Sequence, residues 1–241
     1  MTQPVLDVSP FERIVFFTGA GLSAASGLST YRGQGGIWKD YDYRSVACQE
    51  AFERHPGVVW DFHDQRRAKA AAAEPNAAHR LVAAVQAAVL GTRIVTQNID
   101  GLHQRAGGTD VLELHGSLWG VRCDREGKRW EERRLPPPSR HCDCGAWLRP
   151  DIVWFGDALD ADTLEAAVAA AAACDLFVSV GTSLVVYPAA ALPGIARANG
   201  ATCVEVNPEP SALAGTFDVS LRTGAAEGLA LLWPGLVQQA R

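Results

Sequence analysis

Hydrophobic residues in this chain gather in short runs separated by polar turns. The four clearest runs are RIVFFT at 13–18, TRIVT at 92–96, DLFVSV at 175–180 and ATCVEV at 201–206. Runs of this length that are rich in β-branched and aromatic residues are typical of strands buried on both faces of a parallel sheet. We therefore expect four strands at the centre of the fold.

Longer alanine-rich segments lie between and after these runs and carry helix signals. In PNAAHRLVAAVQAAVLG at 75–91, Asn76 is placed to cap a helix and Gly91 to terminate it. The segment DADTLEAAVAAAAAC at 160–174 begins on acidic residues, and AAEGLALLWPGLVQQ at 225–239 closes the chain. The alternation of strand and helix predicts an α/β fold with a doubly wound parallel sheet.

Two segments interrupt this alternation. Residues 118–150 contain three cysteines, three consecutive prolines at 136–138 and charges of both signs. Their hydrophobic positions show no helical period. They are expected to form a small inserted module within a single domain that spans residues 1–241. Residues 30–75 are expected to form a partly helical lobe over the sheet.

Composition narrows the class of protein. The chain has 241 residues, of which 48% are hydrophobic and 20% charged, and no apolar run approaches the roughly 20 residues of a membrane span. No signal peptide is visible at the N-terminus. The net charge of −5 disfavours nucleic acid as a partner, and a chain of this length does not require its six cysteines as disulfides. We expect a cytoplasmic protein.

The stretch FTGAGLSAASGLSTYRG at 17–33 carries the first chemical signal, because four glycines and four hydroxyl residues follow a hydrophobic strand. A glycine turn between a strand and a helix lets the backbone approach a pyrophosphate. The spacing G-A-G-x-x-x-x-x-G is not the dehydrogenase fingerprint, however, and a simple tight turn is the alternative.

Other motifs extend this signal over nearly the whole chain. GAGLSAASGLSTYRG closely resembles the first motif of the sirtuins, the NAD-dependent protein deacylases. Matching segments follow in the same order: TQNIDGLH at 96–103, LHGS at 114–117, LRPDIVWFGD at 148–157, GTSL at 181–184, VN at 206–207 and GAAEGL at 224–229. The resemblance implies a Rossmann-like domain with a small zinc module.

The family reaction implies roles for individual residues. An acyl-lysine oxygen displaces nicotinamide from NAD, a ribose hydroxyl then attacks the adduct, and O-acyl-ADP-ribose and free lysine result. His115 is expected to act as the base toward the ribose hydroxyl, and Asn98 to order the ribose or a water. The cofactor contacts that we expect are Gly19, Ala20, Gly21, Ser23, Thr30, Tyr31, Arg32, Trp38, Gln97, Asn98, Ile99, Asp100, Gly181, Thr182, Ser183, Asn207, Pro208, Glu209 and Ala226.

The acyl group is less clearly indicated. Many sirtuins read G-I-P-D-F-R where this chain reads GLSTYR at 27–32, and Thr30 in place of Asp resembles the class III branch, which removes succinyl and malonyl as well as acetyl groups. In the Y-x-x-R motif of that branch, Arg66 matches the arginine and His63 stands at the tyrosine. The alternative for both is a solvated helix face. Val153 and Phe155 are expected to pair, as a strand, with the backbone of the substrate peptide.

A zinc site is suggested by the same resemblance, with departures. The family pattern is C-x2-C…C-x2-C, but here Cys123 is followed at that spacing by Glu126, and the second pair reads HCDC at 141–144. The expected ligands are Cys123, Cys142 and Cys144, with His141 as a further candidate and a carboxylate or water completing the set. The alternative is that the metal has been lost and packing holds the module together.

Three functions remain open on the sequence. The first is a deacylase acting on acyl-lysine proteins, and the second is a protein ADP-ribosyltransferase that uses the same pocket. The third is a catalytically silent NAD-binding module. The sequence indicates neither the protein substrates nor the oligomeric state.

Overall fold

The computed structural model describes residues 5–31, 36–39 and 41–238. Its centre is a six-stranded sheet in the order β3-β2-β1-β7-β8-β9, in which every neighbouring pair is parallel. The strands are β1 (Ile14–Thr18), β2 (Arg93–Thr96), β3 (Val111–Glu113), β7 (Leu176–Val180), β8 (Thr202–Val206) and β9 (Val219–Leu221). The predicted parallel α/β sheet is confirmed, with all four expected strands in it.

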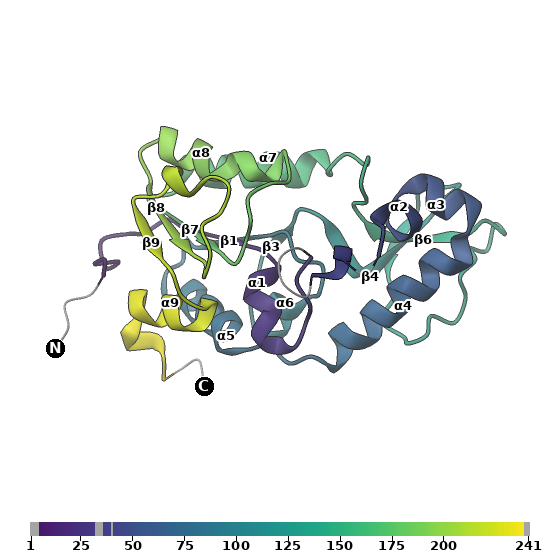
Figure 1. Ribbon diagram of the computed structural model, residues 1–241, viewed down its shortest axis with the longest axis horizontal. Helices are drawn as coiled ribbons and strands as arrows, with labels where there is room; N and C mark the ends of the chain where they lie inside the picture. Colours follow the sequence, from purple (N-terminus) through teal and green to yellow (C-terminus); the bar gives the residue numbers. More distant parts are fainter. Residues whose placement is uncertain (1–4, 32–35, 40, 239–241) are drawn as a thin grey trace.

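Helices cover both faces of this sheet (Figure 1). On one face lie α5 (Ala77–Ala88) and α9 (Ala225–Leu232), and on the other lie α7 (Ala161–Ala173) and α8 (Leu192–Ala198). Side chains of β1 alternate between the two cores: Phe16 packs in the cluster that includes Leu81 and Leu229, and Phe17 in the cluster that includes Ala167 and Leu192. This period of two fixes which face each strand residue supports.

The helix starts follow the predicted capping, but one predicted stop is wrong. Asn76 caps α5 by accepting hydrogen bonds from the backbone N–H groups of Ala78 and His79. The helix ends at Ala88, three residues before Gly91. At Gly91 a Cβ atom would lie 2.1 Å from the carbonyl oxygen of Glu12, so this glycine allows two backbone segments to approach closely.

The two predicted interruptions form a second, smaller layer at the other end of the molecule (Figure 1). Three helices occur in the first of them: α2 (Tyr43–Val46), α3 (Gln49–Arg54) and α4 (Pro56–Ala72). The second holds the antiparallel sheet β5-β4-β6, made of β4 (Gly116–Cys123), β5 (Arg129–Glu131) and β6 (Leu148–Ile152). Trp60 and Phe62 of α4 share one core with Val121 and Leu148 of this sheet, so the lobe and the small sheet pack together.

Two short helices, α1 (Ala20–Ser23) and α6 (Leu102–Arg105), complete the helices around the large sheet. In the part of the chain that the structure describes, no helix has the length and apolar character needed to cross a membrane. Strand order reverses between β1 and β7, since the chain winds outward from β1 through β2 on one side and from β7 through β8 on the other. In open α/β sheets, ligands bind beyond the carboxyl ends of the strands at this reversal.

Candidate active site

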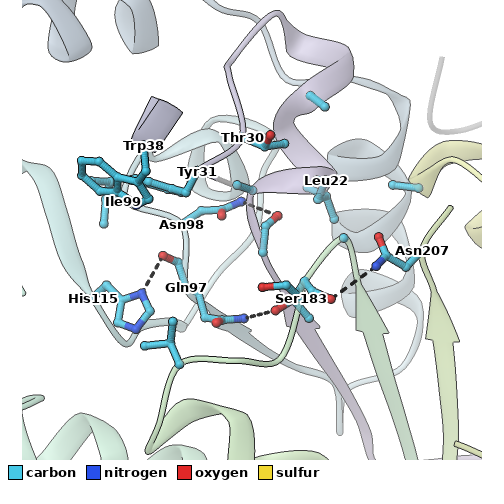
Figure 2. Close-up of a pocket in the computed structure, with 18 of the residues that line it drawn as sticks. Leu22, Thr30, Tyr31, Trp38, Gln97, Asn98, Ile99, His115, Ser183 and Asn207 are labelled. Atoms are coloured by element: carbon cyan, nitrogen blue, oxygen red, sulfur yellow. Dashed lines mark hydrogen bonds between the residues drawn. The ribbon is translucent and has the colours of Figure 1, made fainter. Parts of the chain in front are cut away.

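A cavity of about 1000 Å³ opens beyond the carboxyl ends of β1 and β7. Its wall is built from the segments that follow five strands: 19–22 after β1, 97–99 after β2, His115 after β3, 181–183 after β7 and 206–210 at the end of β8 and beyond it. Figure 2 shows these side chains converging on one space from different strands. The volume is large enough for a dinucleotide together with part of a second substrate.

Glycines in the two loops of the wall allow those loops to pack on each other. The backbone N–H of Gly21 donates to the carbonyl of Gly181 over 2.9 Å. A Cβ atom at Gly21 would lie 2.8 Å from the Cα atom of Gly181, and one at Gly19 would lie 2.7 Å from Thr182. Gly181 also adopts a positive φ of 62°, which side chains disfavour. The glycines of the first motif are therefore required by loop packing, in addition to any approach of a ligand.

His115 faces the cavity with a defined tautomer. Its Nδ1 lies 3.0 Å from the carbonyl oxygen of Gln97, as drawn in Figure 2. Because a carbonyl only accepts, Nδ1 carries the proton and Nε2 keeps its lone pair. Burial lowers the pKa of His115 below its ordinary value, against the opposing effect of this hydrogen bond. The imidazole is thus neutral near pH 7 and able to accept a proton through Nε2.

Two neighbouring amides are held by the loops of the cavity wall. Asn98 is buried, and its Nδ2 donates to the carbonyl of Gly19 at 3.1 Å. Gln97 donates to the hydroxyl of Thr182 at 2.8 Å, which ties the end of β2 to the end of β7. These bonds fix both side chains before any ligand arrives.

Asp100 lines a smaller cavity of about 90 Å³, which shares Ala20, Tyr31, Arg66, Asn98 and Ile99 with the larger one. One carboxylate oxygen accepts from the Ser23 hydroxyl at 2.7 Å and the other from the Leu102 N–H at 2.9 Å. Burial raises the pKa of Asp100. The carboxylate is therefore oriented from two sides at the edge of this small space.

The structure brings together nearly all the residues predicted for the site. Ser23 and Asp100 line only the smaller cavity, and Arg32 lies outside the described residues. The following predicted residues line the larger cavity: Gly19, Ala20, Gly21, Thr30, Tyr31, Trp38, His63, Arg66, Gln97, Asn98, Ile99, His115, Val153, Phe155, Gly181, Thr182, Ser183, Asn207, Pro208, Glu209 and Ala226.

Two further histidines lie buried beneath the site. His79 Nε2 contacts the Ser23 hydroxyl at 3.3 Å, and His103 Nε2 contacts the Thr18 hydroxyl at 2.9 Å. The ring centres of the two histidines are 5.2 Å apart. Burial lowers the pKa of His79 to about 3 and that of His103 to about 4, so both remain neutral. Their role is structural, as expected for histidines inside a folded core.

Replacing His79 by Gln should make the free energy of unfolding less sensitive to low pH. Below about pH 6.5 the unfolded chain binds a proton at His79, whereas the folded chain does not. The free energy of unfolding of the parent therefore falls by roughly 2 kcal/mol, on account of this residue, between about pH 7.5 and pH 5. The free energy of unfolding of His79→Gln should lie below that of the parent at pH 7.5, and this difference should be smaller by that amount at pH 5. Urea unfolding at both pH values measures it.

This comparison of variant and parent is needed because another group acts in the opposite direction. Burial raises the pKa of Glu113 to about 7, so the folded chain gains stability from that residue as the pH falls. Replacing the exposed His55 by Gln provides the matched control and should leave the difference between the two pH values as in the parent. If His79→Gln lowers the free energy of unfolding equally at both pH values, His79 is not held neutral in the folded protein.

His63 and Arg66 occupy neighbouring turns of α4 and line the cavity next to the 153–156 segment. The alternative of a solvated helix face is wrong for His63, which is 1% exposed. Its Nε2 accepts a hydrogen bond from the indole N–H of Trp154 at 3.1 Å, and the two rings stack. Burial lowers the pKa of His63 well below its ordinary value, and the charge of Arg66 acts in the same direction.

The segment expected to pair with a substrate peptide is not a strand in this structure. Strand β6 ends at Ile152, and a turn follows. The N–H of Val153 donates to the carbonyl of His115, and that of Phe155 to the carbonyl of Ala47. These donors are already used inside the chain, so an incoming peptide would have to pair with the carbonyl groups of the segment.

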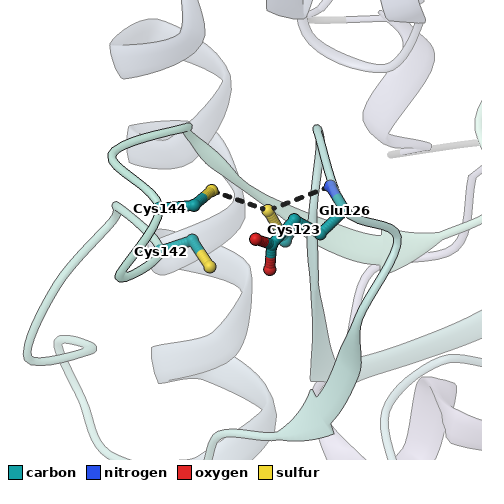
Figure 3. A group of neighbouring side chains, drawn as sticks. All are labelled: Cys123, Glu126, Cys142 and Cys144. Atoms are coloured by element: carbon teal, nitrogen blue, oxygen red, sulfur yellow. Dashed lines mark hydrogen bonds between the residues drawn. The ribbon is translucent and has the colours of Figure 1, made fainter.

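Four side chains in the small sheet form a cluster suited to a metal ion (Figure 3). Cys123, Glu126, Cys142 and Cys144 each offer one ligand atom, and these atoms all lie within 4.8 Å of one another. Three thiolates and a carboxylate match the tetrahedral donor set that zinc prefers. His141, the other candidate, stays outside the cluster because its ring packs on Trp147, with ring centres 4.2 Å apart.

Sequence reasoning missed several residues that line the cavity, among them Ala47, Trp154, Asp157 and Tyr187. Trp154 has the clearest role of these, because it donates a hydrogen bond to His63. The signal that could have indicated it is its place between Val153 and Phe155, both of which were selected as substrate contacts. Its partner lies 91 residues away in the sequence, and only the packing of α4 on the small sheet brings the two rings together.

Comparisons with known proteins point to one family. The sequence model of the Sir2 family matches residues 19–188. An NAD-dependent protein deacylase of Aeropyrum pernix is 47% identical over 217 residues, which cover 88% of each chain. A Sir2 homologue solved in complex with ADP-ribose superposes with a TM-score of 0.93 at 38% identity, over 100% of this chain and 98% of that one. A Sir2 homologue in complex with NAD gives a TM-score of 0.89 at 36% identity, over 98% and 94% of the two chains. The chain belongs to the Sir2 family.

Proposed function

We propose that this protein is an NAD-dependent protein-lysine deacylase, which produces nicotinamide, O-acyl-ADP-ribose and free lysine. The observation that carries the proposal is one cavity that holds the glycine turns, the Gln97–Asn98 pair and the Nε2 lone pair of His115. Relatives at up to 48% identity are named NAD-dependent protein deacylases. NAD would supply the glycosidic bond that breaks and the ribose that receives the acyl group.

The residues of the chain supply the remaining requirements of this reaction. The loops at 19–21 and 181–183 would hold the phosphates and ribose, since both end parallel strands at the reversal of strand order. Asp100, oriented by Ser23 and Leu102, would accept the carboxamide N–H of nicotinamide in the smaller cavity. His115 would remove the proton of a ribose hydroxyl through Nε2.

A single incubation tests the proposal against its alternatives. The protein is mixed with NAD and an acetyl-lysine peptide, and nicotinamide, peptide mass and labelled acceptor protein are measured. Release of nicotinamide together with free lysine supports deacylation. Transfer of ADP-ribose to protein would indicate the transferase, and no reaction with retained NAD binding would indicate the silent module.

We further propose that the enzyme accepts acyl groups that end in a carboxylate. Arg66 lines the cavity beside Val153 and Phe155, and it forms no ion pair with any carboxylate among the described residues. The charge of Arg66 reaches the carboxylate of Asp100 and lowers its pKa, in opposition to burial, but the two form no close ion pair. A guanidinium that faces a cavity without a close ion-pair partner among the described residues is suited to bind an anionic group, through two parallel hydrogen bonds. The protein would then remove succinyl and malonyl groups as well as acetyl groups.

The cysteine cluster supports a structural zinc site with an unusual fourth ligand. We propose that Glu126 completes the set of Cys123, Cys142 and Cys144. The cluster lies in the small sheet and contributes no residue to either cavity, so the metal would hold that sheet together and take no part in the reaction.

Removing the metal should lower the melting temperature of the protein. We expect a decrease of at least about 5 °C after treatment with a chelator, which for a chain of this size corresponds to roughly 2 kcal/mol. Protein purified without chelator should contain about one zinc per chain by metal analysis.

A matched pair of variants tests the fourth ligand. Glu126→Gln removes the anionic donor and should weaken zinc binding about tenfold or more in competition with a chromophoric chelator. Glu131→Gln removes an exposed carboxylate from β5 of the same sheet and should bind zinc as the parent does. Equal affinity of all three proteins would exclude Glu126 as a ligand.

A further inference from the structure

The end of the cavity beside α4 contains one cation and one hydroxyl in contact. Arg66 donates through Nη2 to the hydroxyl of Tyr31. The guanidinium carbon lies 4.9 Å from the ring centre of Tyr31 and 5.6 Å from that of Phe62. Arg66 is thus held in place by aromatic rings, and among the described residues only one of its five N–H donors has a hydrogen-bond partner.

His63 cannot supply a hydrogen bond to an anion at this place. Its Nε2 is occupied as an acceptor by the indole N–H of Trp154, and its Nδ1 is buried away from solvent. Burial and the adjacent guanidinium keep the ring neutral by lowering its pKa. His63 therefore forms a nonpolar wall that orients Trp154, although it occupies the position that the sequence comparison matched to a tyrosine.

Tyr31 offers the group that His63 lacks. Its oxygen accepts from Arg66, and the phenolic hydrogen has no acceptor among the described residues, so it can be donated to a third group. The surrounding surface is aromatic: the ring of Trp38 lies 5.6 Å from that of Tyr31 and 6.5 Å from that of Phe62. An anion that enters this end of the cavity thus meets one cation and one hydroxyl donor side by side.

We propose that Tyr31 and Arg66 together bind the terminal carboxylate of a dicarboxylic acyl-lysine, with the Tyr31 hydroxyl in the place of a donor at position 63. The proposal rests on the proposed function and names a residue that determines acyl specificity. Tyr31 lies on the loop after η1 (Ala24–Ser26), whereas Arg66 lies on α4, so the two halves of the anion site come from segments 35 residues apart.

The test compares two acyl groups that differ only at their ends. Succinyl-lysine ends in a carboxylate and butyryl-lysine ends in a methyl group on a chain of the same length. For Tyr31→Phe, the ratio of kcat/KM for succinyl over butyryl peptide should fall about tenfold, because one hydrogen bond to a charged group is removed. Changes in NAD binding affect both substrates and cancel in the ratio.

Tyr43→Phe is the matched control. Tyr43 belongs to the same aromatic group, with its ring 4.3 Å from that of Phe155, and the variant loses the same single oxygen atom. Its ratio should equal that of the parent, and the melting temperatures of all variants should agree within a few degrees.

The outcomes separate the two proposals. A reduced ratio in Tyr31→Phe with a parent-like ratio in Tyr43→Phe supports the role of Tyr31. A parent-like ratio in Tyr31→Phe together with a reduced ratio in Arg66→Met overturns the role of Tyr31 and leaves the carboxylate specificity standing. An unchanged ratio in both variants, or a parent that does not cleave succinyl-lysine, overturns both.

Discussion

Replacement of His115 by Phe is expected to reduce the turnover of an acetyl-lysine peptide by about 100-fold to 10,000-fold, the usual contribution of a positioned general base. The Nε2 lone pair of His115 is the proton acceptor that the cavity wall presents near the end of β3, and its tautomer is fixed by the carbonyl of Gln97. Phe keeps a ring of similar size but can accept no proton. The measurement is kcat for peptide deacylation at saturating NAD.

The step at which His115 acts gives this prediction a second readout. In the proposed reaction, the base is needed only when the ribose hydroxyl attacks, after nicotinamide has left. Exchange of labelled nicotinamide into NAD in the presence of acyl peptide should therefore fall much less than deacylation. Loss of both reactions to the same extent would indicate that His115 supports binding or folding, and parent-like deacylation would exclude it as the base.

The pH dependence of kcat/KM in the parent protein tests the role of His115 without a substitution. Because burial lowers the pKa of His115, the rise of kcat/KM with pH should have its midpoint below about 6.5. Above that pH the imidazole is neutral and Nε2 can accept the proton.

The large sheet could be predicted from the sequence because the signals for its strands and helices lie within short segments of the chain. Each strand of the core is a short apolar run, and Asn76 marks the start of α5 in the sequence itself. The prediction that Gly91 ends α5 is wrong because the role of this glycine is not local. Its role depends on the carbonyl of Glu12, which is 79 residues earlier in the chain, and no local pattern reports a close approach of that kind.

The same distinction applies to the site. The resemblance pointed to the loops that line the cavity, because its sequence motifs follow the strand ends that form the cavity. It did not reveal that His63 is turned toward Trp154, or that the hydroxyl of Tyr31 meets Arg66. These contacts join α4 to two other segments, so they depend on packing between elements. The choice of Glu126 over His141 at the cysteine cluster depends in the same way on the stacking of His141 on Trp147.

Of the residues proposed for acyl specificity, Arg66 is expected to have the largest effect. Replacing it by Met should lower kcat/KM for a succinyl-lysine peptide by about 10-fold to 100-fold, since hydrogen bonds to a charged group contribute roughly 1.5–3 kcal/mol. Met preserves much of the length of the side chain but removes the guanidinium group, which lies over the ring of Phe62. The butyryl-lysine peptide has no carboxylate, so its kcat/KM should change by less than about threefold, and the ratio between the two substrates is the quantity to measure.

A neighbouring arginine controls for the loss of charge on the same helix. Arg67 points the other way: it is buried and donates to the carbonyls of Leu118 and Glu132, so its replacement by Met should destabilise the small sheet without selecting between acyl groups. We expect Arg67→Met to lower the melting temperature and to leave the succinyl-to-butyryl ratio as in the parent. If Arg66→Met also leaves that ratio unchanged, the guanidinium does not bind the acyl carboxylate. The lack of a close ion pair at Arg66 among the described residues would then reflect only its stacking between Tyr31 and Phe62.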